Sequence, residues 1–345
     1  MTLNTKQTFN FENKMRLLIK PILILLIFIN PFSIYSQVRP LEKTKQQKGY
    51  FVPVIDGDYV HIYDPKGNIF TGPDTKDLKA GEYYPLWQTN DHCFIKGPDK
   101  RWHSFGITHP ASAPGQSRHQ GEFASFHAVS DAKTLESSFR QNSWIDKPKV
   151  LTPAQRPGEG NSNHAPTIVK QSGLFKMIYG PIPFRMAVSK DLYDWKPQGP
   201  IQINEKYGRD PSLMVWKDTY YLVYCSGNVV KASTSKDLKN WSEPVEIYKG
   251  DVESYQCESP TIVPFDGKFY LFWCLWDTAN KNGNGYDERS FVYGSDNPLD
   301  FHGSPLLTEL TTHAPEIFQG EDKQWYISSA QYPNRGINVA RLSWK

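Results

Sequence analysis

The sequence predicts an all-β protein with a five-bladed β-propeller fold, on the basis of a repeat, its spacing and a second motif. One pattern recurs five times: a polar or charged residue, a short apolar strand, a tight turn and a second strand rich in aromatic residues. The copies occupy residues 91–105, 164–179, 210–225, 258–274 and 313–327. Their starts are roughly fifty residues apart, as expected for four strands per blade. The first interval is longer, so we expect it to hold an insertion.

The second motif follows two of the copies closely. Residues 189–195 and 235–241 both read Ser-Lys-Asp-Leu-x-x-Trp, and weaker versions occur at residues 127–130 and 292–295. Each unit therefore supplies at least three short strands and a polar turn, and the aromatic residue that ends the turn can fill the space to the next unit. Five such units in a closed ring would leave only short strand edges exposed.

The N-terminal region predicts export, to the outside of the cell or to the periplasm. Residues 1–36 read as a signal peptide, with a basic start, an apolar run at residues 22–29 and small residues before Gln37. The alternative, a membrane anchor, is disfavoured because the apolar run is short. Residues 37–58 are then a polar leader, and residues 59–345 form the propeller. An alternating segment at residues 58–63 is a candidate for the strand that closes the ring.

Charge and composition exclude several classes of partner. The first 36 residues hold four of the 39 Lys and Arg and one of the 36 Asp and Glu, so the rest of the chain is formally neutral. No clustered basic face indicates a nucleic-acid partner, and no stable membrane insertion is expected after signal cleavage. The four cysteines could form two disulfides, but Cys225 and Cys274 end equivalent strands, where small buried residues suffice, so free thiols are favoured.

Two long loops are expected to wall the entrance of the central funnel, at residues 106–125 and 145–163. Both are rich in Gly, Pro, Ser and Asn, or in His. Long loops on a rigid scaffold often carry function.

The first residues of the five copies are polar or ionisable, where a packed sheet would favour Val or Ile. They are Asp91, His164, Asp210, Glu258 and His313. In a propeller these positions lie near the central axis, so we expect them to converge. Three carboxylates buried together cost free energy through desolvation and repulsion, and at least one of their pKa values rises. Two carboxyl groups, one protonated and one ionised, are what cleaves a bond between sugars.

These motifs resemble those of the family 43 glycoside hydrolases and of their five-bladed relatives in families 32, 62 and 117. That pattern has an Asp opening the first blade, Asp-Pro opening the third and Glu-x-Pro opening the fourth. This chain has Asn90-Asp91, Arg209-Asp210-Pro211 and Glu258-Ser259-Pro260 at those places, and His164-Ala165-Pro166 where the family often has an aromatic residue followed by Ala-Pro. Each motif alone could simply begin a strand; as a set they are moderately specific.

The resemblance implies that Glu258 is the general acid, that Asp91 is the general base and that Asp210 orients and tunes the acid. Family 43 enzymes invert the anomeric configuration, which requires carboxyl groups about 6.5 to 9.5 Å apart. A family 32-like enzyme would instead retain it, with Asp91 as nucleophile and a separation of about 5 to 5.5 Å. His92 stands where a proline is expected, and Cys257 precedes Glu258, whereas family 32 has Cys after Glu. We therefore expect inversion.

Further candidate residues are expected to bind the sugar. They are His164, Arg209, Trp276, His313 and Arg335, each of which could equally have a structural role. As in some family members, His313 could also hold a structural Ca²⁺ through waters in the central channel; no other cofactor is expected.

The predicted function is hydrolysis of a terminal glycosidic bond in a plant or algal oligosaccharide or polysaccharide, by a monomer or small homo-oligomer. The alternative is a carbohydrate-binding propeller in which the carboxylates no longer form a working pair. Intact Asp91, Asp210 and Glu258 favour the enzyme.

Overall fold

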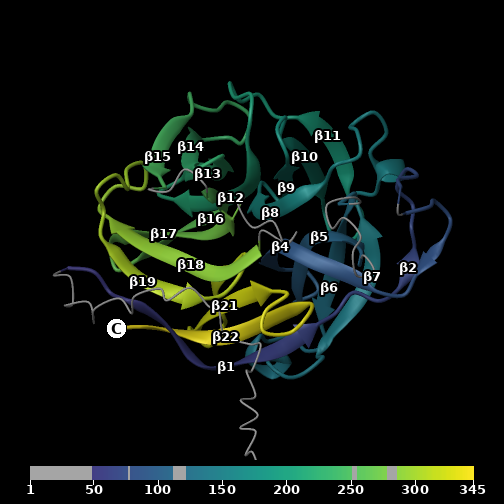
Figure 1. Ribbon diagram of the computed structural model, residues 1–345, viewed down its shortest axis with the longest axis horizontal. Helices are drawn as coiled ribbons and strands as arrows, with labels where there is room; N and C mark the ends of the chain where they lie inside the picture. The colour runs from purple at the N-terminus through teal and green to yellow at the C-terminus, as the bar shows by residue number, and fades with distance from the viewer. Residues whose placement is uncertain (1–48, 77, 112–121, 251–254, 278–285) are drawn as a thin grey trace, which may run out of the picture. The chain divides into compact units, whose positions relative to one another are not determined.

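Five antiparallel sheets of four strands each follow one another around a ring, as Figure 1 shows for the computed structural model. The structure describes residues 49–76, 78–111, 122–250, 255–277 and 286–345, all within one compact unit, residues 44–345. The predicted five-bladed β-propeller is therefore confirmed. The predicted signal peptide and most of the leader lie outside the described residues. No helix in the described part of the chain is long and apolar enough to span a membrane.

The blades follow the order of the chain. The first contains β4 (Trp87–Lys96), β5 (Trp102–Pro110), β6 (Ala124–Ser130) and β7 (Trp144–Val150). The second contains β8 (His164–Gln171), β9 (Leu174–Gly180), β10 (Arg185–Ser189) and β11 (Lys196–Pro200). The third contains β12 (Arg209–Trp216), β13 (Thr219–Ser226), β14 (Val229–Ser235) and β15 (Val245–Lys249). The fourth contains β16 (Tyr255–Phe265), β17 (Lys268–Asp277), β18 (Tyr286–Ser295) and β19 (Leu306–Thr311).

The fifth blade is built from both ends of the propeller. It contains β20 (Ile317–Gln319), β21 (Trp325–Ala330) and β22 (Ile337–Trp344), with β1 (Pro53–Tyr63) as its outer strand. Four short elements lie outside the blades. Strands β2 (Asn68–Ile69) and β3 (Tyr83–Tyr84) form a two-stranded sheet, and η1 (Glu136–Ser138) and η2 (Pro153–Gln155) are 3-10 helices.

The ring is closed by β1, as the alternating segment predicts. Its partner β22 runs antiparallel, from Pro53 opposite Trp344 to Tyr63 opposite Ile337. The strand begins within the segment expected to be a leader, because residues 53–56 already pair with residues 341–344. Closure therefore joins two segments from opposite ends of the described chain by backbone hydrogen bonds, which removes the exposed edge that β22 would otherwise present.

The two predicted loops are shorter than expected. Strand β5 continues to Pro110 and β7 covers residues 144–150, so residues 106–110 and 145–150 are strand. Residues 112–121, the centre of the first loop, lie outside the described residues. The Gly, Thr and Pro content of these segments hid the strands, because ladder pairing with β4 and β6 overrides weak local propensity.

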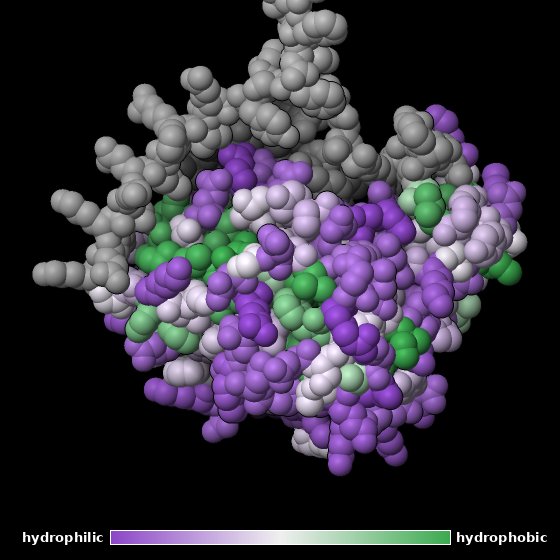
Figure 2. All heavy atoms as spheres, turned by 90° about the horizontal axis from the view of Figure 1, so that it is seen from below, coloured by the Kyte–Doolittle hydropathy of each residue, from purple (hydrophilic) through white to green (hydrophobic). Residues whose placement is uncertain are grey.

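The hydrophobic core lies between neighbouring sheets. Phe105 of the first blade packs with Phe175 of the second, and Val223 of the third packs with Leu271 of the fourth. Because every sheet buries both faces against neighbours, no blade has a core of its own. The face seen in Figure 2 is mostly hydrophilic, with smaller hydrophobic areas between.

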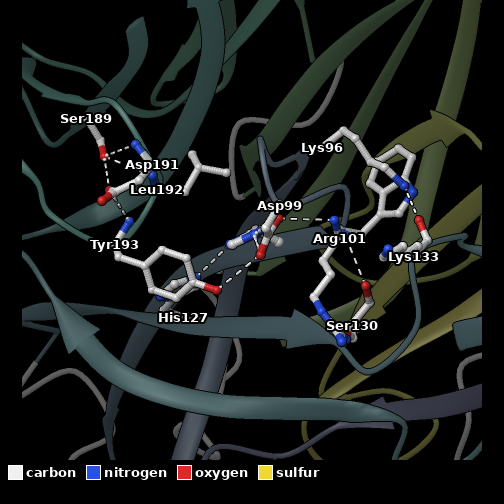
Figure 3. Close-up of polar contacts among 12 residues, drawn as sticks. Lys96, Asp99, Arg101, His127, Ser130, Lys133, Ser189, Asp191, Leu192 and Tyr193 are labelled. Carbon is white, nitrogen blue, oxygen red and sulfur yellow. Dashed lines mark hydrogen bonds and ion pairs between the residues drawn. The ribbon is translucent and has the colours of Figure 1, made fainter.

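The Ser-Lys-Asp-Leu-x-x-Trp motif forms the turn after the third strand of its blade. In the second blade Ser189 Oγ accepts the amide of Leu192, and Asp191 Oδ1 accepts the amides of Tyr193 and Asp194 (Figure 3). Trp195 then packs edge-on against Phe105 of the first blade, with ring centroids 5.6 Å apart. The aromatic residue therefore fills the space to the preceding blade, and not to the next unit as predicted.

A polar network reinforces the same junction. His103 contacts His127 across a 2.9 Å Nδ1···Nε2 hydrogen bond and Asp99 across a 3.1 Å bond, and the Tyr193 hydroxyl donates to Asp99 over 3.3 Å (Figure 3). Both histidines are buried, and burial lowers their pKa values. They therefore stay neutral at pH 7, when one ring can donate and the other accept.

The cysteines are all free and buried, as expected from their strand positions: Cys93, Cys225, Cys257 and Cys274. Burial raises their pKa values, which keeps these thiols protonated and unreactive.

Because β1 closes the ring, we expect truncation of this strand to lower the stability of the protein. A chain that starts at Tyr59 lacks the pairing of residues 53–56 with residues 341–344, and we expect its unfolding free energy to fall by about 2 to 4 kcal/mol. This corresponds to a thermal midpoint lower by about 5 °C or more in calorimetry. The control is a chain that starts at Gly49. Equal midpoints for the two chains would show that this part of β1 does not stabilise the ring.

Candidate active site

The innermost strands of the first four blades each begin with a β-bulge. In β12, Arg209 faces Cys225 and Ser212 faces Val223, so three steps along β12 match two steps along β13. The same shift occurs at residues 89–92, 164–167 and 258–261. Bulges bend a strand, re-aim its side chains and are common beside active sites.

The second residue of the bulge has a left-handed backbone in three of these strands. The angle φ is +42° at Ala165, +54° at Asp210 and +48° at Ser259, and the corresponding residue before the proline of the fifth blade, Ala314, has +47°. A positive φ costs about 1 to 3 kcal/mol for a residue with a side chain. The surrounding sheets must hold this conformation in place. Three of these left-handed residues belong to the bulges that surround the candidate site.

The three predicted carboxylates do not occupy equivalent positions, contrary to the expectation. Glu258 is the first residue of its bulge, Asp210 is the second and Asp91 is the third. Strand pairing thus places Asp91, not His92, where the other blades have proline. The sequence alignment was wrong by one residue because the turn after β4 is longer than the others, and no proline marks the bulge.

The bulges surround a pocket of about 280 Å³ that contains all three carboxylates. Its wall comes from the first four blades and from the segment before β6. The lining residues are Asn90, Asp91, Ile107, Glu122, His164, Arg209, Asp210, Gln256, Glu258 and Trp276. Of the predicted site residues, the structure therefore brings together Asp91, His164, Arg209, Asp210, Glu258 and Trp276.

Two predicted sugar-binding residues do not line this pocket. Arg335 donates through Nη1 to the carbonyl oxygen of Trp87 over 2.7 Å, and its Nη2 lies 3.1 Å from Asp64 Oδ1. The buried His313 has Nδ1 2.9 Å from the carbonyl oxygen of Asp287. Arg335 thus links the end of β1 to β4, and its guanidinium is engaged within the fold.

Arg209 joins two of the carboxylates. Its Nη1 donates to Asp210 Oδ2 over 2.6 Å and to Glu258 Oε1 over 3.0 Å. Asp210 Oδ2 also accepts the backbone amide of Ser259 over 3.2 Å, and it lies 3.3 Å from the thiol of Cys225. Asp210 is therefore fixed from several sides, while one guanidinium offsets part of the repulsion between the two acids.

Glu258 has the properties of a general acid. Its side chain is 4% exposed. Burial, with the negative charges of Asp210 and Glu122, raises its pKa to about 7 despite the opposing charge of Arg209. Oε1 accepts from Arg209, so when Glu258 is protonated its proton belongs on Oε2, which is buried and has no hydrogen-bond partner among the described residues. Burial that raises a carboxyl pKa toward neutrality is how such acids are kept protonated.

Asp91 is buried in the same wall, at 7% exposure. Burial, followed by the charges of Asp210 and Glu258, raises its pKa well above the usual range for Asp. The cluster therefore does not carry three full negative charges at neutral pH. It holds a proton that moves to whichever group is least stabilised as an anion.

Four pocket residues were not predicted as site residues from the sequence: Asn90, Ile107, Glu122 and Gln256. Glu122 Oε2 lies 3.1 Å from His164 Nε2, so the pocket contains a second acid–base pair at its first two blades. Gln256 precedes Glu258 by two residues on β16, and the strand period of two could have indicated that it faces the same side. Glu122 lies in the segment of residues 106–125 that was expected to wall the funnel, but no motif there distinguished it from its neighbours.

The residues around His313 fit the expected Ca²⁺ only in part. In the part of the chain that the structure describes, no group of three or more His, Cys, Asp or Glu side chains could hold a metal ion. His313 Nδ1 donates to the Asp287 carbonyl oxygen over 2.9 Å. Because Ca²⁺ takes oxygen ligands, His313 would meet such an ion through a bound water and not as a direct ligand.

The charge cluster predicts how Glu258 responds to its neighbour. Asp210→Asn removes a negative charge that raises the pKa of Glu258 and leaves Arg209 to act on Glu258 alone, so we expect that pKa to fall below about 7. Carbon NMR of protein labelled at the Glu carboxyl carbons would measure it. Asp194→Asn, an exposed change in the second blade, is the control. An unchanged or higher pKa in Asp210→Asn would show that Asp210 does not tune Glu258.

The fold and part of the sequence match known enzymes. Residues 203–345 match the family model described as glycosyl hydrolases family 43. A search of curated proteins gives no significant match. Among solved structures, an endo-arabinase from Bacteroides thetaiotaomicron VPI-5482 has a TM-score of 0.55 at 15% identity, covering 75% of this chain and 95% of that one.

Two further structures are similar. The β-xylosidase RS223 has a TM-score of 0.55 at 16% identity, covering 75% of this chain and 93% of that one. A family 43 β-xylosidase/α-arabinofuranosidase from a compost microbial metagenome, in complex with xylotriose in a calcium-free form, has a TM-score of 0.55 at 13% identity and covers 81% and 94%. At these identities the likeness establishes the fold. Together with the family match over residues 203–345 and the clustered carboxylates, it supports the resemblance to the family 43 glycoside hydrolases.

Proposed function

We propose that this chain is an exported glycoside hydrolase that releases a sugar from the end of an oligosaccharide or polysaccharide with inversion of configuration. Glu258 is the general acid, Asp91 the general base, and Asp210 the residue that orients and tunes the acid. The observation that carries this assignment is the environment of Glu258: a buried carboxyl group with a pKa near 7, one oxygen held by Arg209 and the other facing no partner among the described residues.

The reaction follows from these environments. The Glu258 carboxyl group donates its proton to the glycosidic oxygen as the bond from that oxygen to the anomeric carbon breaks. Asp91 takes a proton from a water molecule, whose oxygen forms the new bond to the anomeric carbon from the opposite face. One proton leaves Glu258 and one reaches Asp91, so the two carboxyl groups exchange states and solvent restores them.

Asp210 acts through Arg209. When Glu258 has lost its proton, the guanidinium that bridges Oε1 and Asp210 Oδ2 stabilises the new carboxylate. When Glu258 is protonated, Asp210 keeps Arg209 in place without help from the acid. This arrangement balances the acid near neutrality instead of fixing it in one state.

The remaining pocket residues bind and orient the sugar in this proposal. His164 and Arg209 donate to hydroxyl groups, and Trp276 provides an aromatic face for the sugar ring. His313 and Arg335 lie outside the pocket wall, so they support the site: His313 through the channel, where it would hold a hydrated Ca²⁺, and Arg335 through the closure of the ring. No residue of the acid–base pair depends on that ion.

The substrate class is proposed from the pocket and from the relatives. The structurally similar enzymes are described as arabinases, xylanases and xylosidases, which supports a xylose- or arabinose-containing substrate from plant or algal material. The chain would meet such material outside the cell or in the periplasm, as the apolar run at residues 22–29 indicates.

Product analysis tests this function. Proton NMR of products from arabinan, xylan, galactan and algal oligosaccharides should show one released sugar of inverted configuration. In Glu258→Gln, kcat should fall by about 10²- to 10⁴-fold on these substrates. A glycoside with a good leaving group, such as a nitrophenol, should lose much less activity because its departure needs little protonation. Retained configuration would assign Asp91 as a nucleophile, and binding without turnover would identify a carbohydrate-binding module.

Asp91→Asn should separate the base from the acid. Activity should be lost to a similar extent on substrates with good and poor leaving groups, because water activation is needed for both. The difference in thermal midpoint, variant minus wild type, should also be more positive at pH 7 than at pH 3. The reason is that the folded protein raises the pKa of Asp91, so ionisation above the pKa of the unfolded chain destabilises the fold. If the midpoint of the variant, relative to wild type, were lower at pH 7 than at pH 3, Asp91 would not have a raised pKa in the folded protein.

A further inference from the structure

A second cavity, here called the side cavity, lies between the third and fourth blades next to the active-site pocket. Its volume is about 250 Å³, close to that of the pocket. The residues that matter for its chemistry are Tyr248, Gln256, Trp273, Arg289, Phe291 and Tyr293. They come from β15, β16, β17 and β18, so the cavity is a space that two packed blades leave between their sheets.

The side cavity shares a wall with the active-site pocket. Gln256 lines both spaces, and Glu258 lies two residues further along the same strand. Two residues of a strand span roughly 7 Å. A substrate whose reacting bond lies at Glu258 therefore has the side cavity within reach of its neighbouring sugars.

The lining of the side cavity is aromatic. The ring of Tyr248 lies 5.5 Å from that of Trp273 and 4.7 Å from that of Tyr293, and the rings of Trp273 and Phe291 are 4.9 Å apart. Such surfaces suit the apolar face of a sugar ring, and a few polar groups then fix its orientation.

Polar groups are present at the same cavity. The guanidinium of Arg289 is oriented by two hydrogen bonds to Asp287, of 2.7 and 2.6 Å. The Arg289 guanidinium can donate to sugar hydroxyl oxygens, and the Gln256 amide can donate and accept.

A third space adjoins the side cavity. It has a volume of about 480 Å³, shares Tyr248 and Tyr293 with the side cavity and is also lined by Asn228 and Ser304. Gln256 therefore lines the pocket and the side cavity, and the two tyrosines line the side cavity and the third space.

We propose that the side cavity is a binding site for a non-reacting sugar residue of the same oligosaccharide whose terminal bond lies at Glu258. This inference rests on the proposed function, because it takes its ligand from that reaction. The enzyme would then prefer longer or branched substrates, because their additional sugar binds in the side cavity between the third and fourth blades.

Two variants test the proposal from opposite directions. Phe291→Ala removes an aromatic wall of the side cavity, and Leu306→Trp, at another lining position, fills the space. For a tetrasaccharide of the sugar that wild type releases, both should raise KM about tenfold with little change in kcat, which corresponds to about 1.4 kcal/mol. For the nitrophenyl glycoside of that sugar, which reaches only the pocket, KM should change less than about twofold.

The control is Tyr221→Ala. Tyr221 packs against the same hydrophobic cluster but lines neither cavity, so both KM values should stay near wild type. Equal KM changes on both substrates, or no change on either, would overturn the proposal. If Phe291→Ala does not fold, Leu306→Trp decides, since it adds a side chain instead of removing core.

Failure of the proposed function would be recognisable separately. If wild type hydrolyses none of the substrates, the same tetrasaccharides are titrated into wild type and Phe291→Ala by calorimetry. Binding that the substitution weakens about tenfold would keep the side cavity as a sugar site without catalysis. Binding that the substitution leaves unchanged, or no binding at all, would overturn it.

Discussion

The contact on which the site depends is the bridge that Arg209 makes between Asp210 and Glu258. Without a cation between them, two buried carboxylates within reach of each other would both resist ionisation, and the pocket would hold neutral acids. With the bridge, the guanidinium lies between the two carboxyl groups, and Glu258 has a pKa of about 7. The bridge uses only one oxygen of Glu258. The other oxygen can therefore carry a proton toward the pocket.

The bulges make this bridge possible. Arg209 and Asp210 are adjacent, and in a regular strand their side chains would point to opposite faces of the sheet. The bulge, with its positive φ at Asp210, brings both to the same pocket. A left-handed residue and a cluster of like charges each cost stability. The five inter-blade cores and the closure by β1 supply the stability that lets the ring keep them.

The propeller architecture also explains why a cavity can lie beside the active-site pocket. Blades pack through side chains of different size, so a sheet junction can be filled, as by Trp195 and Phe105 between the first two blades, or left partly open, as between the third and fourth. The junctions thus differ in what they can bind although the backbone repeats. In this chain the open junction is the one that adjoins Glu258.

The sequence by itself determined the fold and most of the site. Its repeats and spacing predicted five blades and the closing strand, because strand patterning and turn chemistry are local. The motifs at the blade starts predicted six residues that line the pocket, among them Asp91, Asp210 and Glu258. The tertiary structure alone decided that these three carboxylates stand at different positions of their bulges, that Glu122 faces His164, and that Arg335 is engaged with Asp64. Those outcomes depend on strand register and on contacts between residues far apart in the chain, which no local pattern records.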